Sequence, residues 1–108
     1  MTYELPMDLF QTLADGTRRG LFERLAREGE LSVGALTEGA GVSQPAVSQH
    51  LKALRGAGLV AEARHGRTVL YRANPEGLRP LVGWMGLYGR FWEGRFDALE
   101  DTLNRMDQ

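Results

Sequence analysis

The chain has 108 residues, of which 25% are charged, so it has room for one modest globular core. The absence of cysteine excludes disulfides, thiolate metal sites and thiol redox chemistry. No apolar run approaches the roughly 18 residues of a membrane span, and no secretory signal is recognised, so a cytoplasmic location is expected. The net charge of −1 is unevenly distributed, because residues 42–72 carry five cations against Glu62 alone. A phosphate backbone responds to such a local patch.

The first two predicted helices are short and amphipathic. The first covers Pro6 to Ala14, and its apolar side consists of Leu5, Leu9, Phe10 and Leu13. Asp15 or Thr17 is expected to cap the second helix, and Gly29 to end it. The core side of this second helix is predicted to be Leu21, Phe22, Leu25 and Ala26.

The next two predicted helices are joined by a glycine-bearing turn at Gly39 and Gly41. Ser32 is expected to cap the short third helix. The fourth lies within SQPAVSQHLKALRGAGLV, residues 43–60, with Ser43 as its cap and glycines at its end. Two short helices joined in this way form a helix-turn-helix, although a plain helical hairpin in another all-α domain would share the pattern.

The two sides of this fourth helix differ sharply. At 100° per residue, one side is apolar and consists of Val47, Leu51 and Leu54. The outward side carries amides, a hydroxyl and cations but no carboxylate, whereas a solvated surface usually mixes both signs of charge. This composition suits a helix in a DNA groove, where amides contact base edges and cations contact phosphates. An ordinary amphipathic helix that lacks acids is the alternative. His50 lies toward the buried side and is interpreted as a structural hydrogen-bonding residue.

Residues 60–64 and 68–72 are short segments that contain β-branched or aromatic residues, and His65, Gly66 and Arg67 separate them. They predict a two-stranded hairpin with glycine in its turn. A basic-tipped hairpin after a recognition helix is a wing, whose arginines could contact phosphates or the minor groove. A solvated hairpin tip would have the same composition.

The last predicted element is a long helix from about residue 76 to residue 106. Its apolar stripe exceeds what a small domain can cover, which indicates pairing with a second copy. Four glycines between residues 83 and 94 are interpreted as permitting close helix approach. A pocket for a lipid-like or aromatic ligand is the alternative. The stripe consists of Leu81, Trp84, Met85, Tyr88, Phe91, Trp92, Phe96, Leu99, Leu103 and Met106.

Three segments carry a family resemblance: LADGTRRGLFERL at 13–25, VGALTEGAGVSQPAVSQHLKALRGAGLV at 33–60, and HGRTVLYRA at 65–73. Through them the chain resembles the ArsR-type winged helix-turn-helix repressors of bacteria over nearly its whole length. The resemblance implies one domain, residues 1–108, that is mainly α with a small β-hairpin. It also implies a homodimer built through the terminal helices, five helices with the hairpin between the fourth and fifth, and repression by occupying an operator in double-stranded DNA.

The residues also indicate which branch of the family is resembled. Many members place metal-binding cysteines in the segment matching residues 30–36, and others use histidines on the last helix, but here neither is present. The metal-free branch, without a cofactor, is therefore expected. A sensor that responds to a metal or a small ligand stays open as an alternative, since carboxylates near the C-terminus would suit hard cations.

Residue roles follow from the helix, the hairpin and the resemblance together. Base-edge contacts are predicted for Gln44, Ser48 and Gln49, and an apolar contact for Pro45. Phosphate contacts are predicted for Ser43, Lys52 and Arg67, and a contact with phosphates or the minor groove for Arg64. The predicted dimer interface consists of Leu5, Leu9, Trp84, Tyr88, Phe91, Trp92, Phe96, Leu99 and Leu103.

Other classes of protein fit less well. Two histidines and three serines without a suitable acid pair, and no glycine-rich phosphate loop after a strand, argue against an enzyme. A winged-helix module for protein–protein contact, using the aromatic last helix, is the remaining alternative.

Overall fold

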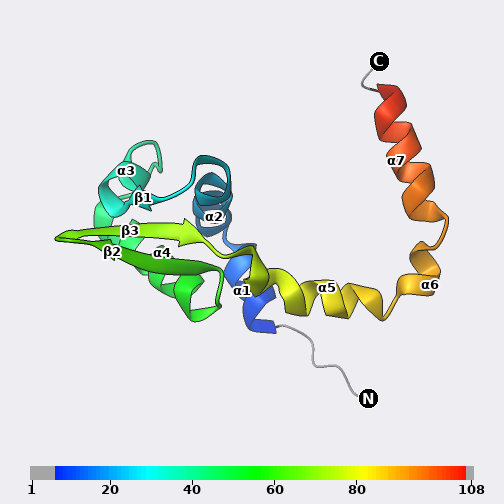
Figure 1. Ribbon diagram of the computed structural model, residues 1–108, viewed down its shortest axis with the longest axis horizontal. Coiled ribbons are helices and arrows are strands. Elements are labelled where there is room, and N and C mark those ends of the chain that lie inside the picture. The colour runs from blue at the N-terminus through cyan, green and yellow to red at the C-terminus, as the bar shows by residue number, and fades with distance from the viewer. Residues whose placement is uncertain (1–6, 107–108) are drawn as a thin grey trace.

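The computed structural model describes residues 7–106, apart from the side chains of residues 7–8, 90, 92 and 96–100. Its helices are α1 (Met7–Ala14), α2 (Gly16–Glu28), α3 (Val33–Thr37), α4 (Gln44–Gly56), α5 (Arg79–Gly86), α6 (Gly89–Trp92) and α7 (Arg95–Met106). A 3₁₀ turn, η1 (Pro75–Leu78), precedes α5. The strands are β1 (Leu31–Ser32), β2 (Val60–His65) and β3 (Thr68–Ala73). Figure 1 shows α1 to α4 and the strands gathered in one body, from which α5 leads away.

Side-chain caps begin three of the helices where the sequence predicts them. Asp15, and not Thr17, caps α2, while Ser32 caps α3 and Ser43 caps α4. Each side-chain oxygen accepts a hydrogen bond from the backbone amide three residues later. These bonds satisfy amides that have no partner inside the helix, so the starts of the helix-turn-helix elements are set locally.

The core lies where α2, α3 and α4 meet. Its fully buried side chains include Leu25 of α2, Leu36 of α3 and Leu54 of α4, none more than 1% exposed. The remaining buried apolar residues are Leu9, Leu21, Phe22, Val47, Leu51, Leu59 and Val60. The predicted core side of α2 is confirmed except at Ala26, which is exposed because it faces away from α3 and α4.

The sheet contains the predicted hairpin and one further strand. β2 and β3 pair antiparallel from Val60 opposite Ala73 to His65 opposite Thr68, and Gly66 enters the two-residue turn with φ 66°. β1 pairs with the other edge of β3, which gives the order β1-β3-β2. A two-residue strand has no sequence period of its own, so the sequence does not predict β1.

The prediction of one continuous C-terminal helix is wrong. The segment is divided into η1, α5, α6 and α7, with turns at residues 87–88 and 93–94. Each glycine lowers helix stability by about 1 kcal/mol, and Gly94 adopts φ 76°, which a right-handed helix does not contain. Gly94 therefore interrupts the helix between α6 and α7, while Gly86 and Gly89 flank the turn at residues 87–88.

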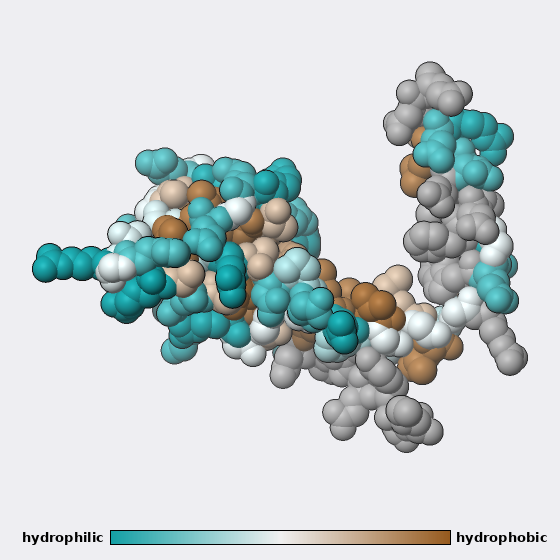
Figure 2. Space-filling model, in the orientation of Figure 1, coloured by the Kyte–Doolittle hydropathy of each residue, from teal (hydrophilic) through white to brown (hydrophobic). Residues whose placement is uncertain are grey.

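The C-terminal helices extend away from the body. The Cα radius of gyration is 16.9 Å, whereas a compact chain of this length would have about 13 Å. One anchor is aromatic: Trp84 of α5 meets Phe10 of α1 edge to face, with ring centroids 5.6 Å apart. This contact packs the start of the last segment against the first helix. Figure 2 shows apolar surface along α5. Within the described residues, no helix has the length and apolarity needed to cross a bilayer.

The close contact between the segment that precedes α5 and the Gly58 carbonyl leads to a prediction about stability. A β-carbon at Gly77 would collide with the Gly58 carbonyl, where Asn74 also docks by donating its side-chain amide to that oxygen at 3.0 Å. We expect Gly77→Ala to lower the free energy of unfolding by about 1–3 kcal/mol, measured by urea denaturation. Gly20→Ala is the matched control, because a β-carbon there meets nothing within 4 Å, and it should stabilise α2 by about 0.5–1 kcal/mol. Equal effects of the two changes would contradict this account.

Candidate nucleic-acid interface

The residues predicted to contact bases lie on the solvent side of α4. We call this side the polar face; it comprises Gln44, Pro45, Ser48, Gln49 and Lys52, all of them exposed. On the opposite side of the helix, the apolar side chains of Val47, Leu51 and Leu54 are at most 1% exposed. The predicted separation of the two sides is confirmed, and α4 itself contains no carboxylate. The specific DNA contacts of these residues stay predictions.

Ser43 and His50 flank the polar face and each has a structural partner. The Ser43 Oγ accepts the capping bond from the Ala46 amide at 3.3 Å, which leaves the hydroxyl hydrogen free to donate to a phosphate. The His50 Nδ1 accepts from the Arg18 Nε at 3.4 Å. The interpretation of His50 as a structural hydrogen-bonding residue is confirmed.

The tip of the wing is basic and exposed. Arg64 and Arg67, the predicted wing contacts, lie at the end of the hairpin, and no carboxylate lies within ion-pair distance of either in the described part of the chain. The neighbouring His65 is 3.3 Å from the Glu30 carboxylate, just before β1. The wing is therefore held against the body beside its tip while its arginines face solvent.

The one acid of the basic segment, Glu62, is used internally. Its carboxylate accepts from Arg55 at the end of α4 and, at 3.3 Å, from the hydroxyl of Tyr71 on β3. Burial raises the pKa of the Tyr71 hydroxyl, and the adjacent Glu62 charge raises it further. Glu62 thus links α4 to both strands of the wing, and its charge is opposed by Arg55 and not by the polar face.

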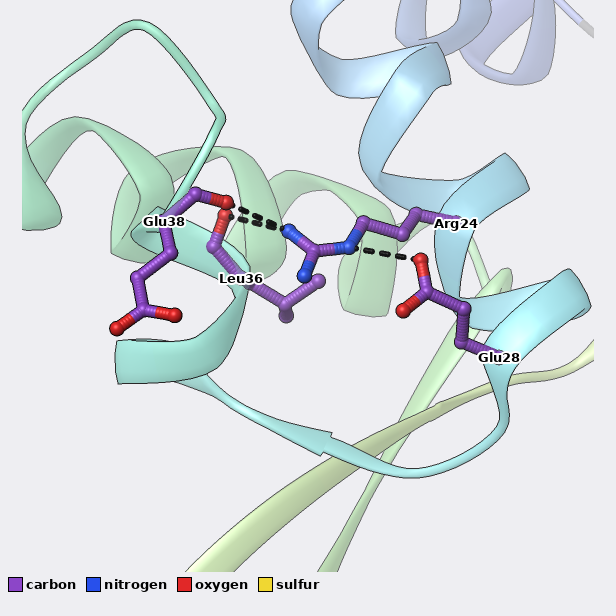
Figure 3. Close-up of polar contacts among 4 residues, drawn as sticks. All are labelled: Arg24, Glu28, Leu36 and Glu38. Carbon is purple, nitrogen blue, oxygen red and sulfur yellow. Dashed lines mark hydrogen bonds and ion pairs between the residues drawn. The ribbon is translucent and has the colours of Figure 1, made fainter.

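Arg24 lies outside the apolar side of α2, as its sequence position indicates, but it also joins α2 to the end of α3. Its Nη1 donates to the carbonyl oxygens of Glu38 at 2.8 Å and Leu36 at 3.3 Å, and its Nε contacts the Glu28 carboxylate at 2.9 Å. Figure 3 shows the guanidinium of Arg24 spanning this gap. The carbonyls at a helix end lack internal partners, so Arg24 caps α3 from a neighbouring helix. Only the Glu28 pairing, four residues apart, is visible in the sequence.

The predicted dimer residues fall into three groups. Leu9 is wrong as an interface residue, because it is 5% exposed and fills the core of its own chain. Tyr88, Phe91 and Leu103 are each at least half exposed, and Trp84 is partly covered by Phe10 and Tyr88. Leu5 lies outside the described residues, as do the side chains of Trp92, Phe96 and Leu99. Phe10 was not predicted for this surface, although its apolar position in the first helix is visible.

Metal ligands do not cluster in the described part of the chain. Among those residues, no three His, Cys, Asp or Glu side chains are close enough together to hold an ion. Of the carboxylates near the C-terminus, Asp101 is exposed, the side chains of residues 97 and 100 lie outside those described, and Asp107 lies outside the described residues.

A helix-turn-helix with a carboxylate-free polar face, followed by a basic-tipped hairpin, defines a winged helix-turn-helix DNA-binding protein. The family model described as "Helix-turn-helix domain" matches residues 13–63. The HTH-type transcriptional regulator Rv2034 of Mycobacterium tuberculosis is 50% identical over 91 residues, covering 84% of this chain and 81% of that protein. The chain belongs to the ArsR family of DNA-binding transcriptional regulators.

Solved structures agree with this assignment. An ArsR-like transcriptional regulator from Rhodococcus sp. RHA1 matches with a TM-score of 0.71 and 30% identity, over 90% of this chain and 91% of that one. A homodimeric winged helix-turn-helix DNA-binding domain, Mb0332 of Mycobacterium bovis, matches with a TM-score of 0.61 and 28% identity, over 78% and 77% of the two chains.

The Arg24 contacts generate a second stability prediction. Arg24→Gln should lower the free energy of unfolding by about 1–2 kcal/mol, because two carbonyls at the end of α3 lose a charged donor. Chemical denaturation measures this, and hydrogen exchange should show faster opening around residues 36–40. Arg27→Gln removes an exposed cation from the same helix and should change the free energy by less than about 0.5 kcal/mol. Equal losses would assign the effect to net charge.

Proposed function

We propose that this chain acts in the cytoplasm as a homodimeric repressor that binds a palindromic operator without a metal cofactor. The observation that carries the proposal is the polar face of α4, exposed and carboxylate-free over a fully buried apolar side. α4 presents amides and a cation where a major groove presents base edges and phosphates.

The polar face supports two kinds of contact. An amide such as that of Gln49 can pair in a bidentate manner with adenine, and Gln44 and Ser48 offer further donors and acceptors. Lys52 is exposed in the second half of α4 and can reach a phosphate, and Arg64 and Arg67 extend the positive charge to the wing. The base contacts account for specificity, whereas the phosphate contacts account for affinity.

The homodimer is supported by apolar surface that the described part of the chain does not cover. Side chains at least half exposed are Val82, Leu87, Tyr88, Phe91, Leu103 and Met106. In a two-fold symmetric dimer, the apolar surface of each chain is buried against the same surface of the other chain. The two polar faces can then contact two half-sites of an operator. The similarity to the homodimeric Mb0332 domain supports the same arrangement.

Genome-wide binding in cells with and without the protein tests the proposal directly. The bound segments should share an inverted repeat whose half-sites are about one helical turn apart, and transcription of the adjacent genes should rise when the protein is removed. Binding without a shared motif would contradict the operator, and falling transcription would contradict repression.

Two substitutions on the polar face should separate specificity from affinity. Gln49→Ala should relax the preference at one position in each half-site, at a cost of about 1–3 kcal/mol for the preferred base. Lys52→Ala should weaken all sequences alike and reduce the salt slope of log K by about 0.9 for each phosphate that is no longer neutralised. Fluorescence anisotropy with operator variants measures both effects. Unchanged discrimination by Gln49→Ala would refute its base contact.

The oligomeric state gives an independent prediction. Sedimentation should report twice the chain mass of 12.0 kDa, and Phe91→Glu should shift the equilibrium toward the single chain by placing a charge in the apolar contact. Ala26→Glu makes a similar change on the exposed side of α2 and should leave the dimer intact. A wild-type protein that sediments as a single chain at micromolar concentration would overturn the homodimer.

A ligand-responsive repressor is the second candidate. Leu81, Trp84, Met85, Tyr88 and Phe91 line a hollow of about 490 Å³, and every one of them is mainly apolar. Quenching of tryptophan fluorescence by a hydrophobic probe, together with release of the operator, would favour this candidate. A stable complex with another protein and no specific DNA retention would favour the protein-interaction module.

A further inference from the structure

A second element borders the polar face of α4. A surface hollow of about 680 Å³ is lined by Arg18 of α2 and by six residues of α4 between Pro45 and Ala53. Pro45, Gln49 and Lys52 belong to both the hollow and the polar face. No carboxylate lines the hollow, so its charged side chains are Arg18 and Lys52.

The contacts of Arg18 leave most of its guanidinium available. Its Nε donates to the His50 Nδ1 at 3.4 Å, which requires that nitrogen to carry no hydrogen. Within the described residues its terminal nitrogens make no hydrogen bond, and no carboxylate lies within 4.0 Å. His50 therefore orients a cation that lines the hollow and whose terminal nitrogens remain available to a ligand.

The width of the DNA major groove places a phosphate strand near Arg18 when α4 lies in the groove. A helix in the major groove, about 12 Å wide, has a sugar-phosphate strand along each flank. Arg55 on one flank of α4 is already paired with Glu62, whereas Arg18 borders the helix at the hollow without such a partner. A strand that follows the α2 side of α4 would meet Arg18 and Lys52 together.

We propose that Arg18 of α2, oriented by His50, binds a backbone phosphate of the DNA strand that flanks α4, together with Lys52. This inference rests on the proposed DNA binding and extends the interface beyond the helix-turn-helix and the wing. His50 is a positioning residue, since it acts through Arg18. The contact is independent of sequence, so it contributes affinity and register and no base preference.

Asp15 is the carboxylate that opposes this contact. Its carboxylate accepts a hydrogen bond from the Arg18 backbone amide at 2.9 Å, and this bond holds the pKa of the Asp15 carboxyl below its ordinary value, although partial desolvation acts in the opposite direction. Asp15 is therefore ionised at neutral pH. Asparagine preserves the cap at this position but removes the negative charge. Asp15→Asn should therefore change DNA affinity in the direction opposite to the loss of Arg18.

The test uses the full chain and a labelled 30-bp duplex of mixed sequence, because a phosphate contact does not need the operator. Anisotropy titrations over a series of salt concentrations give the slope of log K. Arg18→Gln should reduce that slope by about 0.9 per protomer, and Arg18→Lys should preserve it. Arg27→Gln, nine residues along on the opposite face of α2, should leave the slope unchanged.

Three further variants keep the test independent of folding defects. Asp15→Asn should tighten binding at low salt, whereas His50→Leu should weaken binding and His50→Asn, which retains an acceptor, should bind as the wild type does. An unchanged slope in Arg18→Gln, an equal drop in Arg27→Gln, or no gain in Asp15→Asn would overturn the inference. Failure of the wild type to bind the duplex at low salt would instead overturn the proposed function.

Discussion

Burial of one side of α4 is the constraint on which the rest of the molecule depends. Val47, Leu51 and Leu54 are held between α2 and α3 with no more than 1% of their surface exposed. Removing three such side chains from water contributes several kcal/mol, comparable with the whole stability of a small domain. Because a helix is rigid, fixing this side also fixes the direction of the polar face. The orientation of the polar face is thus a consequence of how the core packs.

Polar contacts then fix the relative orientation of the elements on either side of α4. Arg24 joins α2 to the end of α3 and so controls the turn that leads into α4. Glu62 joins the far end of α4 to the wing. The two positions are complementary, since one lies before the recognition helix and the other after it. The charged groups of Arg24 and Glu62 are paired with other groups of the protein, whereas Lys52 and the wing arginines face solvent.

Most of the helix-turn-helix could be predicted from the sequence, because the signals that determine it are local. A capping serine such as Ser43, a 3.6-residue period and a glycine turn each act within a few positions. Arg24 and Arg18 were not anticipated as joining residues, since their partners lie 12 or more positions away along the chain. The C-terminal error has a different origin. The apolar spacing favoured a helix, but the backbone preference of Gly94 and its neighbours was stronger.

The breaks in the C-terminal segment have a consequence for how two copies would span DNA. A single rod would transmit any rotation of one subunit directly to the other. Here the turns at residues 87–88 and 93–94 divide the segment into three short helices, α5, α6 and α7. In the proposed homodimer, these turns would allow the distance between the two α4 helices to vary, so that half-sites of slightly different spacing could be bound without strain in either core.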